Sequence, residues 1–493
     1  MRILVFKSSF TLTNLNRVES VLNYQNKGFV VTVGIFVSLL IAYLTASVGV
    51  LVPLLSIAIG VISIFLIIVF QNPLYGLIST LIYCFCFALV ERELGGFPFG
   101  YVVELLYVVV TLAAILKTSS KDWKRAQNDL LLLFSLWFLV SVLQLLNPSG
   151  ASFDGWLSEI RTSGFDSFML ILLGFLIFKT VRHLDIFLFI IIACSLLATL
   201  NGMKQLHIGL FAGEQQFLDA NPTHMIWGQL RVFSFYRDAG QFGASQACFV
   251  VICGVLAFGP FKLWKRIVFS FLTLFFFYGM LISGTRGAFF ALVPGIFLAV
   301  FLFKNIRVLL SGTLFLASFI AVLKYTYIGS GFSYVHRLRS ALDPTDPSLN
   351  LRFLNQQILS DYIKDFPFGG GLGVMGYAGG KYNSNMFLSA IAPDSYWVKV
   401  WGMYGIVGFT LWFCMMGYIL GKCCGIVWNI KDERLRVKLT ALTASFFGVF
   451  ICSYGNEVIN ALPTSIVTYL SLVLIYMGPL FDNDLMNRDK QLP

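Results

Sequence analysis

Long apolar runs recur along almost the whole chain, and each approaches the length that a helix needs to cross a bilayer. The hydrocarbon core of a membrane is about 30 Å thick, which takes about 20 apolar residues of helix. Helices are the expected form because backbone groups in lipid must pair within their own segment. Fourteen such runs lie near residues 29–49, 51–70, 74–90, 100–116, 129–146, 164–179, 184–200, 241–259, 267–283, 288–303, 307–324, 399–420, 438–455 and 464–481. The sequence therefore predicts an all-α, polytopic integral membrane protein with about 12–14 transmembrane helices.

The composition supports a membrane protein and excludes a string of soluble domains. Of the 493 residues, 58% are hydrophobic and 12% are charged, whereas soluble domains carry about 25% charged residues. The net charge of +11 is typical of the positive inner loops of membrane proteins, so no nucleic-acid partner is expected. The nine cysteines fall mostly inside apolar runs, where cysteine behaves as a small hydrophobic residue. We expect no cofactor, and no metal site because the chain has neither a CxxC pair nor a histidine cluster.

Basic residues in the loops orient the predicted helices. When the N-terminus is placed inside, the inner loops hold 22 of the 35 Lys and Arg residues, as the positive-inside rule requires. The first 28 residues mix charged and polar residues without a cleavage signal, so the first helix is expected to act as an uncleaved anchor. We therefore predict a multi-pass protein with both termini in the cytoplasm.

This orientation divides the chain into six predicted parts. They are a cytoplasmic segment (1–28), N-terminal transmembrane helices (29–200), transmembrane helices with outer arginine motifs (201–324), a large outer loop (325–393), C-terminal transmembrane helices (394–481) and a cytoplasmic tail (482–493). Residues 351–366 are amphipathic and precede Pro367, which predicts a short helix over the outer mouth. Residues 152–163 are a second candidate for an interfacial helix.

Several arginines fall on the predicted outer side, against the general charge bias. They are Arg231, Arg237, Arg286, Arg337, Arg339 and Arg352. Arginine suits phosphate binding because its planar fork donates two hydrogen bonds and stays charged. Such a set could hold a lipid-linked pyrophosphate. The alternative is that each arginine is a solvated loop charge or reaches toward lipid headgroups.

Arg286 is the most informative of these arginines. It lies in LISGTRGAFFALVPG, in a very short turn between two apolar runs, beside the small residues Gly284 and Gly287. A half-buried arginine at a helix junction is costly unless an anion or carboxylate pairs with it. A nearby acid would make Arg286 structural, and a substrate phosphate would make it functional. We favour the substrate phosphate.

Three further features could contribute to chemistry. The glycine-rich segment 365–380 (DFPFGGGLGVMGYAGG) lacks the Lys-Ser/Thr of a phosphate-binding P-loop, so it is either a flexible loop or a backbone surface close to a ligand. Asp394 opens the twelfth run and is either a helix cap or a general base. His224 and His336 are alternative bases on the outer side.

Four segments resemble the O-antigen ligase and polymerase-like family. SGTRGA (283–288) is similar to its Ser-x-(Ser/Thr)-Arg-Gly-Ala signature, and RVFSFYRDAGQFGA (231–244) is similar to its Arg-x-(Tyr/Phe)-(Gly/Ser)-x-Phe segment. RFLNQQILSDYIKDFPFGGGLG (352–373) resembles the Arg…Pro-x-x-Gly-x-Gly segment. DSYWVKVWGMYGIVG (394–408) resembles the His-Asn-x-x-Leu…Gly-x-x-Gly segment. The order and spacing agree over roughly residues 190–420.

The resemblance implies a GT-C-like fold and a metal-independent, inverting glycosyltransferase of the bacterial inner membrane. Such enzymes move a glycan from undecaprenyl pyrophosphate to a hydroxyl of lipid A–core (ligases), of another lipid-linked repeat unit (polymerases), or of a protein Ser or Thr. A chain-length regulator and a flippase are the implied protein partners. Asp394 and Arg286 are the predicted catalytic residues. The predicted pyrophosphate-binding residues are Arg231, Arg286, Arg237, Arg352 and Arg339.

Two departures from the family pattern favour one member of the family. Asp394 replaces the histidine of the ligase motif, and residues 238–241 (DAGQ) replace its Asn-Pro-Asn. We therefore predict a polymerase of O-antigen or exopolysaccharide, with a ligase or a protein O-oligosaccharyltransferase as the alternative. A transporter of polysaccharide or lipid-linked substrate is the alternative from another class. It is less favoured because transporters place ionisable groups near the midplane, whereas here Glu104, Asp166 and Lys399 lie near predicted helix ends.

Overall fold

The computed structural model describes residues 27–95, 99–226, 228–304, 306–328, 331, 333–340, 342–343, 347–391, 393 and 395–489. Most of these residues are helical, and the strands they form, β1 (Met225–Ile226) and β2 (Gln229–Leu230), make one short antiparallel hairpin. The predicted all-α class is therefore confirmed. Most of the predicted cytoplasmic segment 1–28 lies outside the described residues.

The chain forms two compact units, Met1–Gln71 and Asn72–Pro493. The first unit contains α2 (Lys27–Val48) and α3 (Leu51–Gln71), which pack against each other. Gly49 lies between them with φ of 95°, a left-handed conformation that glycine adopts without steric cost. The described part of unit 1 is therefore a pair of helices joined by a turn.

The second unit contains the remaining helices. Its longer helices are α4 (Pro73–Leu94), α5 (Tyr101–Lys117), α7 (Asp129–Leu143), α9 (Asp166–Ile177), α10 (Val181–His207), α12 (Ala239–Ala257), α13 (Leu263–Ile282), α14 (Phe289–Leu302), α15 (Ile306–Tyr325), α17 (Pro347–Ile363), α19 (Tyr396–Asn429), α20 (Glu433–Cys452), α21 (Thr464–Tyr476) and α22 (Gly478–Asp489). The shorter ones are α6 (Ser120–Ala126), α8 (Phe153–Ile160), α11 (Ala212–Ala220), α16 (Ser333–Ser340) and α18 (Gly376–Tyr382).

Local sequence explains where many of these helices begin. Asn72 and Asn128 accept hydrogen bonds from Leu74 N and Leu131 N, and they cap α4 and α7. A side-chain oxygen at this position satisfies a backbone N–H that the helix itself leaves unpaired. The predicted interfacial segments are also helical, because residues 152–163 contain α8 and residues 351–366 overlap α17.

Nine helices of the described chain are long and apolar enough to cross a membrane, and a tenth span is possible if α21 and the bent α22 count as one. This confirms a multi-pass protein. Each of the fourteen predicted runs falls on one of the helices in the structure. Several of these helices are short for a span, among them α14, so the predicted count of 12–14 spans remains a prediction.

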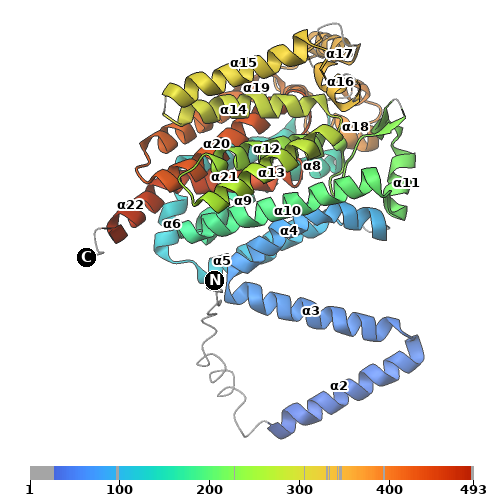
Figure 1. Ribbon diagram of the computed structural model, residues 1–493. Helices are drawn as coiled ribbons and strands as arrows, with labels where there is room; N and C mark the ends of the chain where they lie inside the picture. The colour runs from blue at the N-terminus through green and yellow to red at the C-terminus, as the bar shows by residue number, and fades with distance from the viewer. Residues whose placement is uncertain are drawn as a thin grey trace. The chain divides into compact units, whose positions relative to one another are not determined.

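The second unit has its core around α12, which packs against α13, α14 and α20. An 18-residue stretch of α12 is 89% buried inside the protein. At one end of this unit lie α11, α16, α17 and α18, and at the opposite end lie α6 and α22 (Figure 1). We call the first the α16 end. It gathers the segments that the sequence assigns to the outer side, and the structure thus brings those segments together.

Candidate functional site

The SGTRGA segment forms a tight turn between α13 and α14. Gly284 lies just after the C-terminus of α13 and has a φ of 57°. Thr285 N donates to Ser283 Oγ at 3.2 Å. Arg286 follows, half-buried, at the start of the short 3-10 helix η4 (Arg286–Ala288). The side chain of Asn456 fills the space where a Cβ on Gly287 would project. The turn therefore depends on both glycines and holds Arg286 at the α16 end.

Two further arginines contact this turn. Arg231, which follows β2, donates from Nη2 to Thr285 Oγ1 at 3.2 Å. Arg337 of α16 donates from Nε to Gly284 O at 2.6 Å. A Cβ added at Gly284 would lie 3.5 Å from Arg231 Cγ and 3.6 Å from Arg337 Cδ. Both side chains therefore lie against the turn that carries Arg286.

Arg352 of α17 lies near the same turn, next to Gly455. Its Nη1 is 3.9 Å from the position of a Cβ added at Gly455, and that position is 4.0 Å from Gly287 Cα. We call Arg231, Arg286, Arg337 and Arg352 the arginine cluster. Its members come from four segments that are far apart in sequence.

Burial and neighbouring charges shape the electrostatics of the cluster. Burial lowers the pKa of Arg231, Asp238 opposes this shift and Arg286 adds to it. Burial also raises the pKa of Asp238, but His224 and the charge of Arg231 outweigh burial and hold that pKa below its usual range. His224 Nε2 lies 3.4 Å from Asp238 Oδ2. Asp238 is therefore an ionised carboxylate beside Arg231.

Arg231 also has a buried donor that no described residue satisfies. Its Nε has no hydrogen-bond partner among the described residues, and a buried unpaired donor costs about 1–3 kcal/mol. An anion or an ordered water would remove this cost. The position of Arg231 is therefore suited to an anionic ligand.

Two of the predicted pyrophosphate-binding residues, Arg237 and Arg339, contact other groups in the structure. Arg237 is 55% exposed at its side chain, and its Nη2 lies 2.8 Å from Glu91 Oε2. Arg339 donates from Nη2 to Ile328 O at 2.6 Å. No described contact joins Arg237 to the arginine cluster, and the predicted roles of both residues remain predictions.

Asp394, the predicted base, lies outside the described residues, so its role remains a prediction. Ser395 follows it and caps α19, because its side chain accepts from Val398 N at 3.3 Å. The alternative prediction that Asp394 is the cap is therefore wrong. Of the other predicted bases, His224 is buried beside Asp238, and His336 is exposed on α16.

Arg92 of α4 supports the segment that carries Arg231, a role the sequence does not reveal. Its Nη2 donates to Ser234 O at 2.8 Å and to Tyr236 O at 2.9 Å. Its guanidinium also lies over the Phe233 ring, 4.8 Å from the centroid. Ser234 has an unusual φ of 49° for a residue other than glycine. These contacts fix the backbone between Arg231 and α12.

The central part of the glycine-rich segment packs against α19, and a role of the segment in binding a ligand remains a prediction. Gly370 N donates to Gly402 O at 2.9 Å, and Gly371 N donates to Met403 O at 3.0 Å. Residues 369–375 are buried. The contact coincides with a break in α19 at Gly405, whose φ is 70°. Glycines here allow two backbones to approach closely.

A trio of charged side chains, two of them buried, lies next to this contact. Lys399 of α19 places its Nζ 2.9 Å from Glu159 Oε1 and 3.0 Å from Glu457 Oε2. Ser163 Oγ donates to Glu159 Oε1 at 3.0 Å. Buried charges are stable only when they are paired and hydrogen-bonded. The sequence marked Lys399 as a charge near a helix end but gave no indication of its two partners.

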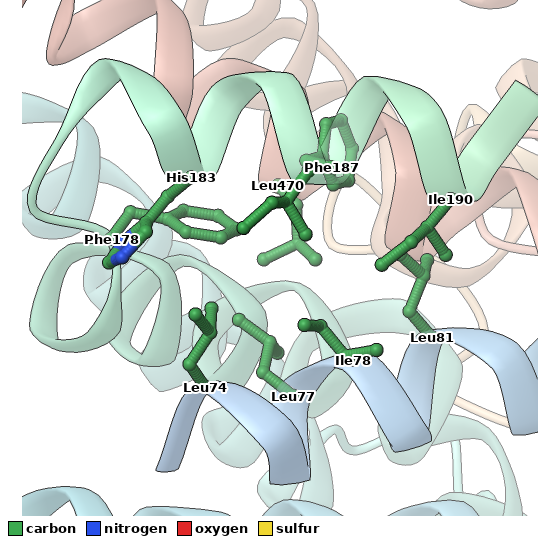
Figure 2. A pocket seen from close by; sticks show the side chains of 10 residues that line it. Leu74, Leu77, Ile78, Leu81, Phe178, His183, Phe187, Ile190 and Leu470 are labelled. Atoms are coloured by element: carbon green, nitrogen blue, oxygen red, sulfur yellow. The ribbon is translucent and has the colours of Figure 1, made fainter. Parts of the chain in front are cut away.

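Two small hollows differ in chemistry. One lies at the arginine turn and is lined by Met280, Leu281, Gly284, Thr285, Tyr334, Arg337 and Leu338. The other lies between α4, α10 and α21, where leucine, isoleucine and phenylalanine side chains and His183 surround it (Figure 2). His183 accepts from Lys179 N at 3.1 Å. The first hollow combines an arginine with apolar walls, whereas the second is almost entirely apolar.

The fold and the site together define a multi-pass α-helical membrane protein with clustered arginines at one end of its bundle. Residues 269–413 match the family model described as O-Antigen ligase. This range includes Arg286, Arg337 and Arg352, and it confirms the resemblance to the O-antigen ligase and polymerase-like family. The family implies a glycosyltransferase-like activity on lipid-linked glycans in a membrane. No curated protein matches the chain.

Proposed function

We propose that the protein polymerises O-antigen or exopolysaccharide repeat units on the extracytoplasmic face of the bacterial inner membrane. The donor would be an oligosaccharide linked to undecaprenyl pyrophosphate. The observation that carries the proposal is the arginine cluster around the turn between α13 and α14, of which Arg286, Arg337 and Arg352 lie within the family match. Arg286 lies at its centre.

The cluster suits a reaction whose leaving group is a diphosphate. When the bond between the sugar and the phosphate breaks, negative charge develops on the phosphate oxygens. Arginines that already face this position stabilise the charge without rearranging, and one such group contributes about 10²–10³ in rate. Direct attack by the acceptor hydroxyl would invert the anomeric carbon. The arginines supply positive charge to the diphosphate in place of a metal ion.

The acceptor distinguishes the alternatives within the family. The family's ligase motif has a histidine where this chain has Asp394, which favours a polymerase whose acceptor is a second lipid-linked repeat unit. A ligase or protein O-oligosaccharyltransferase would use the same donor site. A transporter would carry the lipid-linked glycan across the membrane without breaking its bond to phosphate.

Replacement of Arg286 tests the proposal. We expect Arg286→Ala and Arg231→Ala to abolish the ladder of surface polysaccharide on a gel, at normal protein level. Arg182→Ala is the matched control, because Arg182 is exposed at the start of α10, and it should leave the ladder unchanged.

The alternative functions predict different results for these variants. Loss of attachment to lipid A–core with intact lipid-linked polymer would indicate a ligase, and accumulation of lipid-linked units inside would indicate a transporter. An unchanged ladder in Arg286→Ala would contradict the proposal.

A further inference from the structure

The loop between α20 and α21 connects the arginine cluster with the charge trio. Cys452 Sγ donates to Gly287 O at 3.1 Å, on the turn of Arg286. Gly455 lies beside Arg352 Nη1, and Asn456 packs on Gly287. Glu457 is the next residue, and its carboxylate is 3.0 Å from Lys399 Nζ. In this loop, the carboxylate of Glu457 therefore directly follows Asn456, whose side chain contacts the turn that carries Arg286.

The two carboxylates on Lys399 differ in access. The side chain of Glu159 is 6% exposed and also accepts from Ser163, whereas the side chain of Glu457 is 29% exposed. With all three groups ionised, the trio has a net charge of −1. A proton taken up by Glu457 makes the trio neutral and leaves Lys399 paired with Glu159. Glu457 is thus the member that can exchange a proton with a substrate or with water.

We propose that Glu457 is the catalytic base that takes the proton from the acceptor hydroxyl, with Lys399 as its positioning residue. This inference rests on the proposed function, because it needs a diphosphate donor at the arginine cluster. A general base must lie within hydrogen-bond reach of the hydroxyl in the reacting complex. The short loop from Gly455 to Glu457 carries both the glycine beside Arg352 Nη1 and the proposed base, so it ties the base to the arginine cluster.

The proposed step balances as a single displacement. The acceptor oxygen forms a bond to the anomeric carbon as the bond from that carbon to the phosphate oxygen breaks. The electron pair of the broken bond leaves with undecaprenyl pyrophosphate, which the arginines stabilise. The hydroxyl proton passes to a Glu457 carboxylate oxygen and then to water.

The test uses the full-length protein in lipid nanodiscs, with undecaprenyl-pyrophosphate-linked repeat units extracted from the strain that makes them. The measured rate is the release of undecaprenyl pyrophosphate. We expect Glu457→Gln to lower kcat by about 10²–10⁴, with the donor KM unchanged. Glu433→Gln is the control, since it removes a carboxylate whose side chain is 66% exposed at the start of α20 and lies 3.4 Å from Arg436 Nη2. We expect it to keep the wild-type kcat.

The following outcomes decide the inference. Wild-type kcat in Glu457→Gln would overturn it, as would a loss of kcat that appears in Asp394→Asn but not in Glu457→Gln. If Glu457→Gln does not fold, Glu457→Asp decides, because it keeps the charge on Lys399 but withdraws the oxygens by one methylene. A folded Glu457→Asp with lowered kcat supports the inference, and wild-type kcat rejects it. Arg286→Ala separates the two proposals, because wild-type release in that variant would reject the proposed function itself.

Discussion

At the scale of single residues, two arginines of the cluster, Arg231 and Arg337, are held by hydrogen bonds to one short turn. Thr285 is central, because its Oγ1 accepts from Arg231 at 3.2 Å and donates to Ala239 O at 3.0 Å. It therefore links Arg231 to the start of α12. The arginine side chain is oriented by this neutral hydroxyl and by the carbonyl of Thr223, and the carboxylate of Asp238 lies nearby.

We expect Thr285→Val to weaken donor binding by about tenfold, because a hydrogen bond to a charged group contributes about 1.5–3 kcal/mol. Valine has nearly the same shape as threonine but cannot hold Arg231 in place. The measurement is the donor KM of the purified protein in nanodiscs. Thr273→Val is the control, since its hydroxyl donates only within α13, to Phe269 O at 2.8 Å. Equal KM values for the two variants would show that Thr285 does not position Arg231.

Individual residues also show which parts of the site could be predicted from the sequence and which could not. Arg231, Arg286 and Arg352 were predictable because each lies in a motif and because arginine favours phosphate. Arg92 was not, since its partners Ser234 and Tyr236 are 142 and 144 positions away. A sequence shows a lone charge at the end of an apolar run but does not show which distant carbonyl groups it meets.

At the scale of elements, α19 contains a break that its apolar sequence does not predict. The sequence predicted one span over 399–420, and the structure has a helix from Tyr396 to Asn429 with a break at Gly405. The break has φ of 70° and ψ of −173°, a conformation that only glycine adopts readily. Contacts with the glycine-rich segment determine it, so no pattern within α19 itself could predict it.

We expect Gly405→Ala to destabilise the protein by at least about 1–3 kcal/mol, the usual strain of such a backbone conformation. The new methyl group would also meet the carbonyl of Pro367. Gly417→Ala is the matched control on the same helix, where a Cβ meets nothing within 4 Å, and it should be neutral or stabilising by up to about 1 kcal/mol. Thermal unfolding in detergent measures both. A Gly405→Ala protein as stable as wild type would show that the break is not required.

At the scale of the whole molecule, every residue of the arginine cluster and of the charge trio lies in the second unit. The first unit contributes a pair of helices, α2 and α3, and none of these site residues. The pattern of basic loops predicts the side of the membrane that each end faces. The structure brings the predicted outer segments to the α16 end (Figure 1), so one reversal of orientation would move all of them together.

Deleting whole helices from the first unit tests both the orientation and the location of the site. Removal of residues 29–71 keeps the basic N-terminal segment and removes two predicted crossings, so α4 still enters the membrane from the same side. We expect this shortened protein to make a normal polysaccharide ladder. Removal of residues 29–50 deletes one crossing and should invert the rest of the chain, because the basic N-terminal segment stays inside. That protein should make no ladder, and a reporter fused to its C-terminus should report the opposite side. A ladder from both proteins would contradict the predicted orientation, and a ladder from neither, with normal protein levels, would place a necessary function in the first unit.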